Sequence, residues 1–134
     1  MGEVENSICL DTDILIELLR NKAEIVAWIK EHEENCHLAT TIINIFELFY
    51  GVYLSNSPKI KMKEVNNLIE RLTVLDISLK SANEAGKQLA RLKKEGELIE
   101  FRDVLIGTTS LVEGFSLKTN NKTHFSRVEG LRLV

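Results

Sequence analysis

Three acidic residues stand in apolar stretches of the sequence, where an ionised carboxylate is out of place. Asp11 ends the apolar run "ICL", Glu47 lies within "IINIFELFYG", and Asp103 begins "DVLIGTTSLV". Burial of an unpaired carboxylate costs several kcal/mol, because the charge loses its hydration. Each of the three side chains therefore needs a cation, a network of hydrogen bonds or a place at the edge of the fold.

A shared divalent cation would neutralise all three acids together. Ligation by oxygen atoms alone favours Mg²⁺ or Mn²⁺ over zinc. The hypothesis predicts that Asp11, Glu47 and Asp103, which are far apart in the chain, converge in one coordination sphere.

Each acid also has a simpler interpretation. Asp11 could be a turn residue, and Asp103 could be an acid in the first turn of a helix, where the helix dipole favours a negative charge. Glu47 could project from the edge of a buried helix, although no Lys or Arg lies within one helical turn of it. These alternatives remain open for each residue taken singly.

Other chemistries find less support in the sequence. The segment "DTD" (11–13) resembles the nucleophile motif of a HAD-type phosphatase, but the fifth motif position holds Leu15 and no late Asp-Asp pair follows. Asp76 is a poor candidate for the phosphorylated residue of a receiver domain. The histidines lack the spacing of zinc ligands; they are His32, His37 and His124.

Alternating apolar runs and amphipathic segments indicate the elements that must position these acids. We expect strands at 8–11, 36–40, 73–78 and 115–119, with a short last strand possible at 131–134. We expect helices from 12 or 13 to 20, and over 22–33, 42–54, 58–71, 80–95 and 101–112. Such alternation requires crossover connections, so the predicted fold is α/β, a three-layer α/β/α arrangement around a mostly parallel sheet of four or five strands.

The predicted sheet places the polar residues that follow its strands at one edge. Ligands of such folds bind beyond the carboxyl ends of the strands. Asp11, residues 40–41, Asp76 and residues 119–121 each follow a strand and should lie there.

Length and composition describe an ordinary globular chain. Its 134 residues suit one domain, 1–134, and its 44% hydrophobic content and net charge of −3 argue against disorder and against an overall basic DNA-binding module. We expect a cytoplasmic protein with no membrane span, because "MGEVENS" lacks a signal pattern and no apolar run reaches about 20 residues. Cys9 and Cys36 are expected to be reduced core residues.

Four segments, in order along the chain, resemble the motifs of the PIN-domain family, and specifically of VapC-like ribonuclease toxins. They are "LDTDILIELLR", "TTIINIFELFYGVY", "FRDVLIGTTSL" and "LKTNNKTHFSRVEGLRLV". The resemblance spans essentially the whole chain. Each motif is loose on its own, but the four together are fairly specific.

The resemblance implies that Asp11, Glu47 and Asp103 are metal ligands. The family often has a fourth acid in its last motif, where this chain has Asn121, with Asn120 as the alternative position. An amide oxygen can ligate a metal but adds no negative charge, so whether one or two ions bind is left open.

Several neighbouring residues are implied to support the ligands. Asp13 could cap the first helix or act near the metal, and Thr119, Thr12 and Thr41 could hydrogen-bond to ligand carboxylates. Many relatives have a further acid where this chain has Phe101.

The implied function is Mg²⁺- or Mn²⁺-dependent endoribonuclease activity, as the toxin of a VapBC-type toxin–antitoxin pair. The implied partners are an RNA substrate, an antitoxin protein and a second copy of the chain, with 42–54 or 58–71 as candidate dimer faces. Arg102 or Lys118 could steer the RNA phosphates. The alternative is a non-catalytic PIN-like module that binds RNA or antitoxin, and neither the RNA target nor the cleaved sequence can be inferred.

Overall fold

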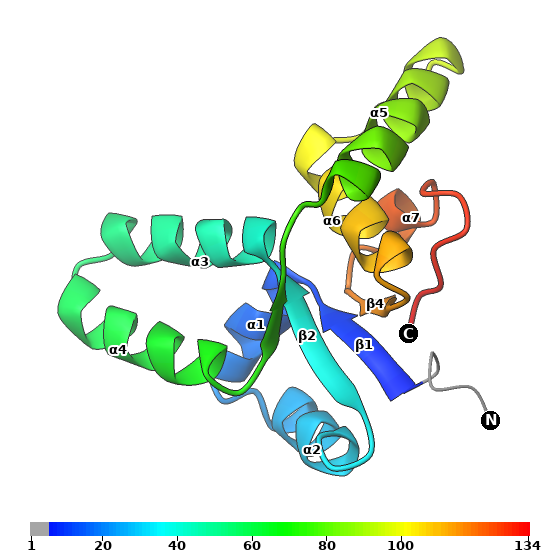
Figure 1. The fold of residues 1–134 in the computed structure, drawn as a ribbon. Coiled ribbons are helices and arrows are strands. Elements are labelled where there is room, and N and C mark those ends of the chain that lie inside the picture. Colours follow the sequence, from blue (N-terminus) through cyan, green and yellow to red (C-terminus); the bar gives the residue numbers. More distant parts are fainter. Residues whose placement is uncertain (1–5) are drawn as a thin grey trace.

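The computed structural model describes residues 6–134 (Figure 1). Residues 1–5, which belong to the predicted domain and to the segment inspected for a signal pattern, lie outside the described residues. The elements are β1 (Ser7–Leu10), α1 (Thr12–Leu19), α2 (Ala23–His32), β2 (His37–Thr41), α3 (Ile42–Leu54), α4 (Pro58–Ile69), β3 (Thr73–Leu75), α5 (Leu79–Lys94), α6 (Phe101–Val112), β4 (Ser116–Lys118) and α7 (Lys122–Phe125).

The four strands form one parallel sheet in the order β3-β2-β1-β4. Cys9 of β1 stands opposite Ala39 of β2 and Leu117 of β4. Because all four strands run in the same direction, their carboxyl ends meet at one edge of the sheet. Asp11 and Thr119 follow the two neighbouring strands β1 and β4 at that edge.

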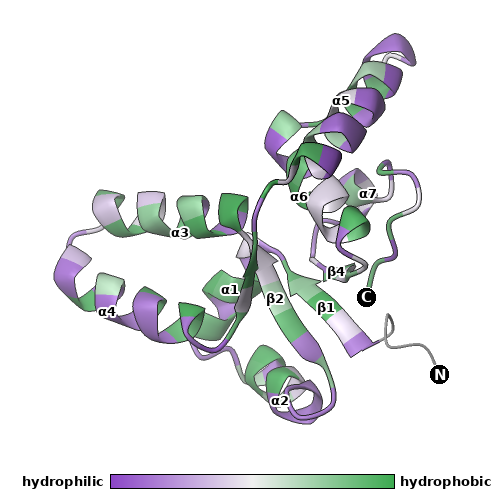
Figure 2. Ribbon diagram, viewed as in Figure 1, coloured by the Kyte–Doolittle hydropathy of each residue, from purple (hydrophilic) through white to green (hydrophobic). Residues whose placement is uncertain are grey.

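Helices cover both faces of the sheet, which confirms the predicted three-layer α/β fold. Alternate residues of β1 point to opposite faces: Ile8 and Leu10 pack with α1, α2, α3 and α4, whereas Cys9 packs with α6 and α7. Helix α5 lies against α6, away from the sheet. Figure 2 shows the hydrophobic residues gathered on β1, β2 and α3, and the largely hydrophilic surface of α5.

Some predicted strand limits were too generous. The strand predicted at 8–11 ends at Leu10, and the one predicted at 73–78 ends at Leu75, because Ser78 instead caps α5 through a capping box with Ser81. The possible strand at 131–134 is reduced to a single parallel bridge between Leu117 and Leu133. The sheet therefore has four strands.

The cap of the first helix was predicted one or two residues too late. The sequence also allowed the helix to begin after a cap at Thr12 or Asp13. Asp11 is the N-cap of α1 instead, because its extended backbone lets its carboxylate accept a hydrogen bond from the Thr12 amide. The predicted start of α3 after Thr41 and the end of α5 near Gly96, which has φ 74°, are confirmed. The one-turn helix α7 was not predicted.

Two further expectations can be compared with the described residues. Cys9 is buried, Cys36 is half-buried just before β2, and both are free thiols. Across residues 6–134, no helix has both the length and the apolar character that crossing a bilayer requires.

Candidate active site

Asp11 lies at the centre of a buried hydrogen-bond network at the carboxyl edge of the sheet. Its carboxylate is 7% exposed. Oδ1 accepts bonds from the Thr12 amide (2.8 Å) and from Asn44 Nδ2 (3.1 Å), and Oδ2 accepts one from Thr119 Oγ1 (2.7 Å). Within residues 6–134 Asp11 forms no ion pair, so hydrogen bonds alone stabilise its negative charge.

Asn44 is a site residue that inspection of the sequence missed. It is fully buried in the first turn of α3, where its Oδ1 accepts a bond from Thr41 Oγ1 (2.7 Å) and its Nδ2 donates to Asp11 and to Thr12 Oγ1 (2.8 Å). The feature of the sequence that could have indicated Asn44 is its polar amide side chain within the most apolar helix of the chain. Thr41, expected to bond a carboxylate, bonds Asn44 instead.

Glu47 lies one turn further along α3 and is connected to the same network. Its Oε1 accepts a hydrogen bond from Thr12 Oγ1, as the sequence suggested for Thr12. Its Oε2 lies 4.0 Å from Arg102 Nη1, the outer limit of an ion pair, and both side chains are partly exposed. The sequence offered no cation within one helical turn, and the fold supplies Arg102 from α6.

Asp103 lies in the first turn of α6, beside α7. Its Oδ2 is 3.8 Å from His124 Nδ1, and that same ring nitrogen is 2.9 Å from Asn121 Nδ2. The fold thus joins Asn121 to Asp103 through His124, a residue that the sequence analysis considered only as a zinc ligand. The backbone amide of Asn121 also donates to Thr119 Oγ1 (3.0 Å), which links this group to the Asp11 network.

Asn120 and Asp13 form a separate group on the α1 side. The Asn120 amide nitrogen donates to Asp13 Oδ2 (3.0 Å), and Asn120 Nδ2 donates to Glu17 Oε2 (3.0 Å). The Lys118 side chain also lies on this side of the molecule, with its Nζ 4.5 Å from the centre of the ring of Trp28 in α2. Of the two candidate positions for the missing fourth acid, Asn121 is therefore the one connected to Asp103, through His124.

Comparison with known proteins shows the family of the chain. Residues 8–131 match the sequence model of the PIN domain. This chain belongs to the PIN-domain family. It is 32% identical over 124 residues to ribonuclease VapC2 of Haemophilus influenzae, and the match covers 92% of each chain. It is 29% identical to the tRNA(fMet)-specific endonuclease VapC of Shigella flexneri, again over 92% of each chain.

Solved structures resemble this PIN domain over nearly its whole length. The VapBC2 complex of Rickettsia felis, bound to a DNA fragment from its promoter, superposes with a TM-score of 0.90 at 26% identity, over 96% of this chain and 97% of the other. The DNA-bound VapBC complex of Salmonella typhimurium gives a TM-score of 0.88 at 28% identity, over 96% of each chain. The fold is therefore that of VapC proteins.

The carboxylates of this PIN domain influence one another. Burial raises the pKa of Asp11 to about 6, against the lowering effect of the Thr119 hydrogen bond, and the charges of Asp13 and Asp103 raise it further. Burial also raises the pKa of Asp103, and the charge of Glu47 adds to that effect. The electrostatic repulsion links Asp11 to Asp103 and Asp103 to Glu47, so a cation placed among them would relieve it.

The carboxylates of Asp11, Glu47 and Asp103 do not surround one common position for an ion. Within residues 6–134, no group of three or more His, Cys, Asp or Glu side chains is close enough to hold one ion, so the expected single coordination sphere is not present in this arrangement. The physical reason is that Glu47 is bonded to Thr12 and Arg102, and Asp103 faces His124. The donors are nonetheless all carboxylate oxygens, which suit Mg²⁺ or Mn²⁺.

Proposed function

We propose that this PIN domain is a metal-dependent endoribonuclease, the toxin of a VapBC-type toxin–antitoxin pair. The observation that supports it most is the electrostatic repulsion that links Asp11, which follows β1, to Asp103 of α6, and Asp103 to Glu47 of α3. The pKa values of Asp11 and Asp103 are both raised, and sites that hold such perturbed groups are often functional. The ribonuclease names of the VapC relatives agree with this activity.

In this proposal Asp11, Glu47 and Asp103 are the metal ligands, with Asn121 beside Asp103. Bound Mg²⁺ or Mn²⁺ would offset the phosphate charge and lower the pKa of a water molecule. Asn44 and Thr119 hold the Asp11 carboxylate in one orientation through their bonds to its two oxygens. A carboxylate oriented in this way loses little freedom when the ion binds.

Arg102 is the cation best placed to contact the RNA. It is 41% exposed and lies within 4.0 Å of Glu47, so a phosphate bound there would also be close to the carboxylates. Lys118, the other residue considered from the sequence, lies over Trp28 on the α1–α2 side of the molecule. We therefore propose Arg102, and not Lys118, as the residue that steers the phosphate.

The test is RNA cleavage by the purified chain with Mg²⁺, with Mn²⁺ and with a chelator. Asp11→Asn and Glu47→Gln should each nearly abolish cleavage while the circular dichroism spectrum stays unchanged. Asp76→Asn is the matched control, because Asp76 is an exposed acid at the end of β3 that takes no part in the network. Initiator tRNA is a sensible first substrate in view of the Shigella relative's name.

Cleavage that continues undiminished in both variants would refute the assignment. Folded wild-type chain that binds RNA or antitoxin but cleaves nothing with either metal would instead favour the non-catalytic module. The HAD-type phosphatase is not compatible with membership of the PIN-domain family.

We further propose that the chain forms a homodimer through α3. This helix exposes a row of large apolar side chains, and the rings of Phe46 and Tyr50 are stacked with centroids 6.3 Å apart. Such a patch is unfavourable in water and is typical of an interface. The exposed residues are Ile42, Phe46, Tyr50, Tyr53 and Leu54, whereas α4 (58–69) exposes only Ile60 among its large apolar residues. Sedimentation of Phe46→Ser should then give a monomer.

An antitoxin is the second proposed protein partner, by analogy with the solved VapBC complexes. A cavity of about 200 Å³ next to Glu47 offers a place for one of its apolar side chains. Its apolar walls come from α1, α3 and α4, namely Ile16, Leu19, Leu48, Val52 and Val65. A peptide that binds there should inhibit cleavage. Gly51→Phe should weaken that inhibition, because Gly51 also lines the cavity and has open space at its Cβ position.

A further inference from the structure

The one-turn helix α7 needs support from outside itself. It spans only Lys122–Phe125, and a single helical turn is unstable on its own. It nevertheless carries His124 and follows Asn121, the two residues beside Asp103. Two apolar side chains, Phe125 and Val128, are buried beneath it, but these hold one side of the segment only.

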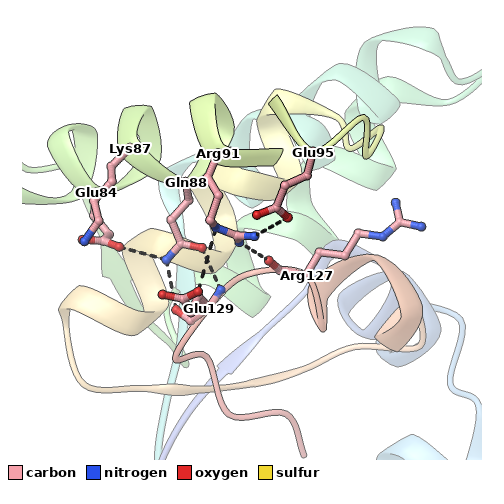
Figure 3. Close-up of polar contacts among 7 residues, drawn as sticks. All are labelled: Glu84, Lys87, Gln88, Arg91, Glu95, Arg127 and Glu129. Carbon is pink, nitrogen blue, oxygen red and sulfur yellow. Dashed lines mark hydrogen bonds and ion pairs between the residues drawn. The ribbon is translucent and has the colours of Figure 1, made fainter. Parts of the chain in front are cut away.

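Gln88 of α5 holds the backbone that follows α7. Its side chain is only 2% exposed. Its Nε2 donates to the carbonyl oxygen of Glu129 (2.9 Å) and to Glu84 Oε2 (2.8 Å), and its Oε1 accepts from the amide nitrogen of Glu129 (2.7 Å). Figure 3 shows the amide facing the Glu129 backbone across the gap between α5 and the C-terminal segment. Gln88 therefore binds both the backbone carbonyl oxygen and the backbone amide of Glu129.

Arg91, one turn further along α5, holds the same segment two residues earlier. Its Nη2 donates to the carbonyl oxygen of Arg127 (2.8 Å), and its Nη1 is held by Glu95 Oε1 (3.1 Å), as Figure 3 shows. Arg127 in turn contacts the loop between α5 and α6, where its Nε lies 3.0 Å from Glu97 Oε2. That loop leads directly into the first turn of α6, which carries Asp103.

We propose that Gln88 and Arg91 are positioning residues that hold segment 126–130, and through it keep Asn121 and His124 beside Asp103. We call this pair of contacts the α5 clamp. Neither side chain contacts Asp11, Glu47 or Asp103, so the clamp acts only through the chain segment that it holds. Its effect on cleavage rests on the function proposed above, whereas its effect on the motion of the chain does not.

Gln88→Met tests the clamp, because methionine keeps the length of the side chain and removes its bonds to Glu129. Lys87→Ala is the matched control on the same helix: Lys87 is 74% exposed and only reaches Glu84, at 3.9 Å. Hydrogen exchange should be measured at the backbone amides of residues 125–128, each of which donates a hydrogen bond to a carbonyl oxygen in residues 121–125. The kcat and KM for RNA cleavage provide the second readout.

In Gln88→Met we expect exchange of these amides to be about tenfold faster, the size expected for the loss of two hydrogen bonds, with no change in β1. The kcat should fall about tenfold with KM unchanged, because the geometry beside Asp103 loosens while Arg102 is undisturbed. Lys87→Ala should show neither effect. Should Gln88→Met fail to fold, Arg91→Met removes the bond to Arg127 and should produce the same pair of changes.

Unchanged exchange in a folded Gln88→Met protein would overturn the proposal, because the buried Phe125 and Val128 would then suffice. Faster exchange with wild-type kcat would also overturn it, since the held segment would have no part in the reaction. If the wild-type chain cleaves no RNA, the proposed function fails by itself, and the exchange measurements alone decide whether the clamp exists.

Discussion

Replacement of Asp11 with Asn should make the metal-free protein more stable at neutral pH. Burial raises the pKa of the Asp11 carboxyl from 3.8 to about 6, although the Thr119 hydrogen bond opposes the rise. The folded state therefore binds this proton more tightly than the unfolded state does. The resulting stability is fully present below pH 3.8 and is lost as the pH rises to about 6. At about 1.4 kcal/mol per pKa unit, the ionised carboxylate costs about 3 kcal/mol at pH 7.

An asparagine can keep the hydrogen bonds of Asp11. Its carbonyl oxygen can accept from the Thr12 amide and from Asn44 Nδ2, as Oδ1 does now. Its NH₂ group would face Thr119 Oγ1, a hydroxyl that can accept as well as donate. Neutral hydrogen bonds are weaker than those made to a carboxylate, so the expected net gain at pH 7 is about 1–3 kcal/mol.

Urea denaturation between pH 4 and pH 8, with a chelator present, measures this effect. The difference in free energy of unfolding between Asp11→Asn and the wild type should be smallest at pH 4 and should grow to its full value by pH 7. Asp76→Asn, at an exposed position, should show no such trend. An Asp11→Asn protein that is less stable than the wild type at pH 7, or a difference that does not vary with pH, would refute the reasoning. Added Mg²⁺ should then stabilise the wild type more than the variant.

Three further substitutions test a hydrogen bond at Asp11 and the packing of two helices. Thr119→Val should lower the free energy of unfolding by about 2 kcal/mol, because a buried oxygen of the Asp11 carboxylate loses its hydrogen-bond donor. It should also raise the pKa of Asp11 further. Urea denaturation measures the first effect and NMR titration the second. Gly107→Ala in α6 should cost about 1–3 kcal/mol, because its Cβ would come within 3.0 Å of Val128 Cγ2. Gly86→Ala in α5, where no atom lies within 4 Å, should instead stabilise the chain by about 0.5–1 kcal/mol, and equal thermal melts of the two variants would contradict both expectations.

Much of the fold could be predicted because its elements carry local signals. A strand in a parallel sheet is apolar on both faces, and helices such as α4 and α5 have a polar and an apolar side, so the alternation of the two is visible in the chain. The limits of β3 were less predictable, because the residue types at 76–78 are compatible both with a longer strand and with the cap of the next helix. Helix α7 escaped notice because one turn has no period to detect.

The candidate site was predictable in part for the same reason. Asp11, Glu47 and Asp103 stood out because each breaks an apolar run. Asn44 did not, since an amide in the first turn of a helix has an ordinary capping role. His124 did not either, because its proximity to Asp103 depends on the path of a chain segment that α5 holds from a distance.

The amino-acid sequence by itself determined that this protein is a parallel α/β domain with Asp11 at the carboxyl edge of its sheet and with two more acids, Glu47 and Asp103, in apolar helices, because burial and periodicity are local properties of a chain. Only the tertiary structure decided which groups meet those acids: Thr119 and Asn44 at Asp11, Thr12 and Arg102 at Glu47, and His124 at Asp103. Most of these contacts join residues more than twenty positions apart. Such contacts form when the packing of helices and strands brings distant backbone segments together, and no local sequence pattern shows which segments will meet.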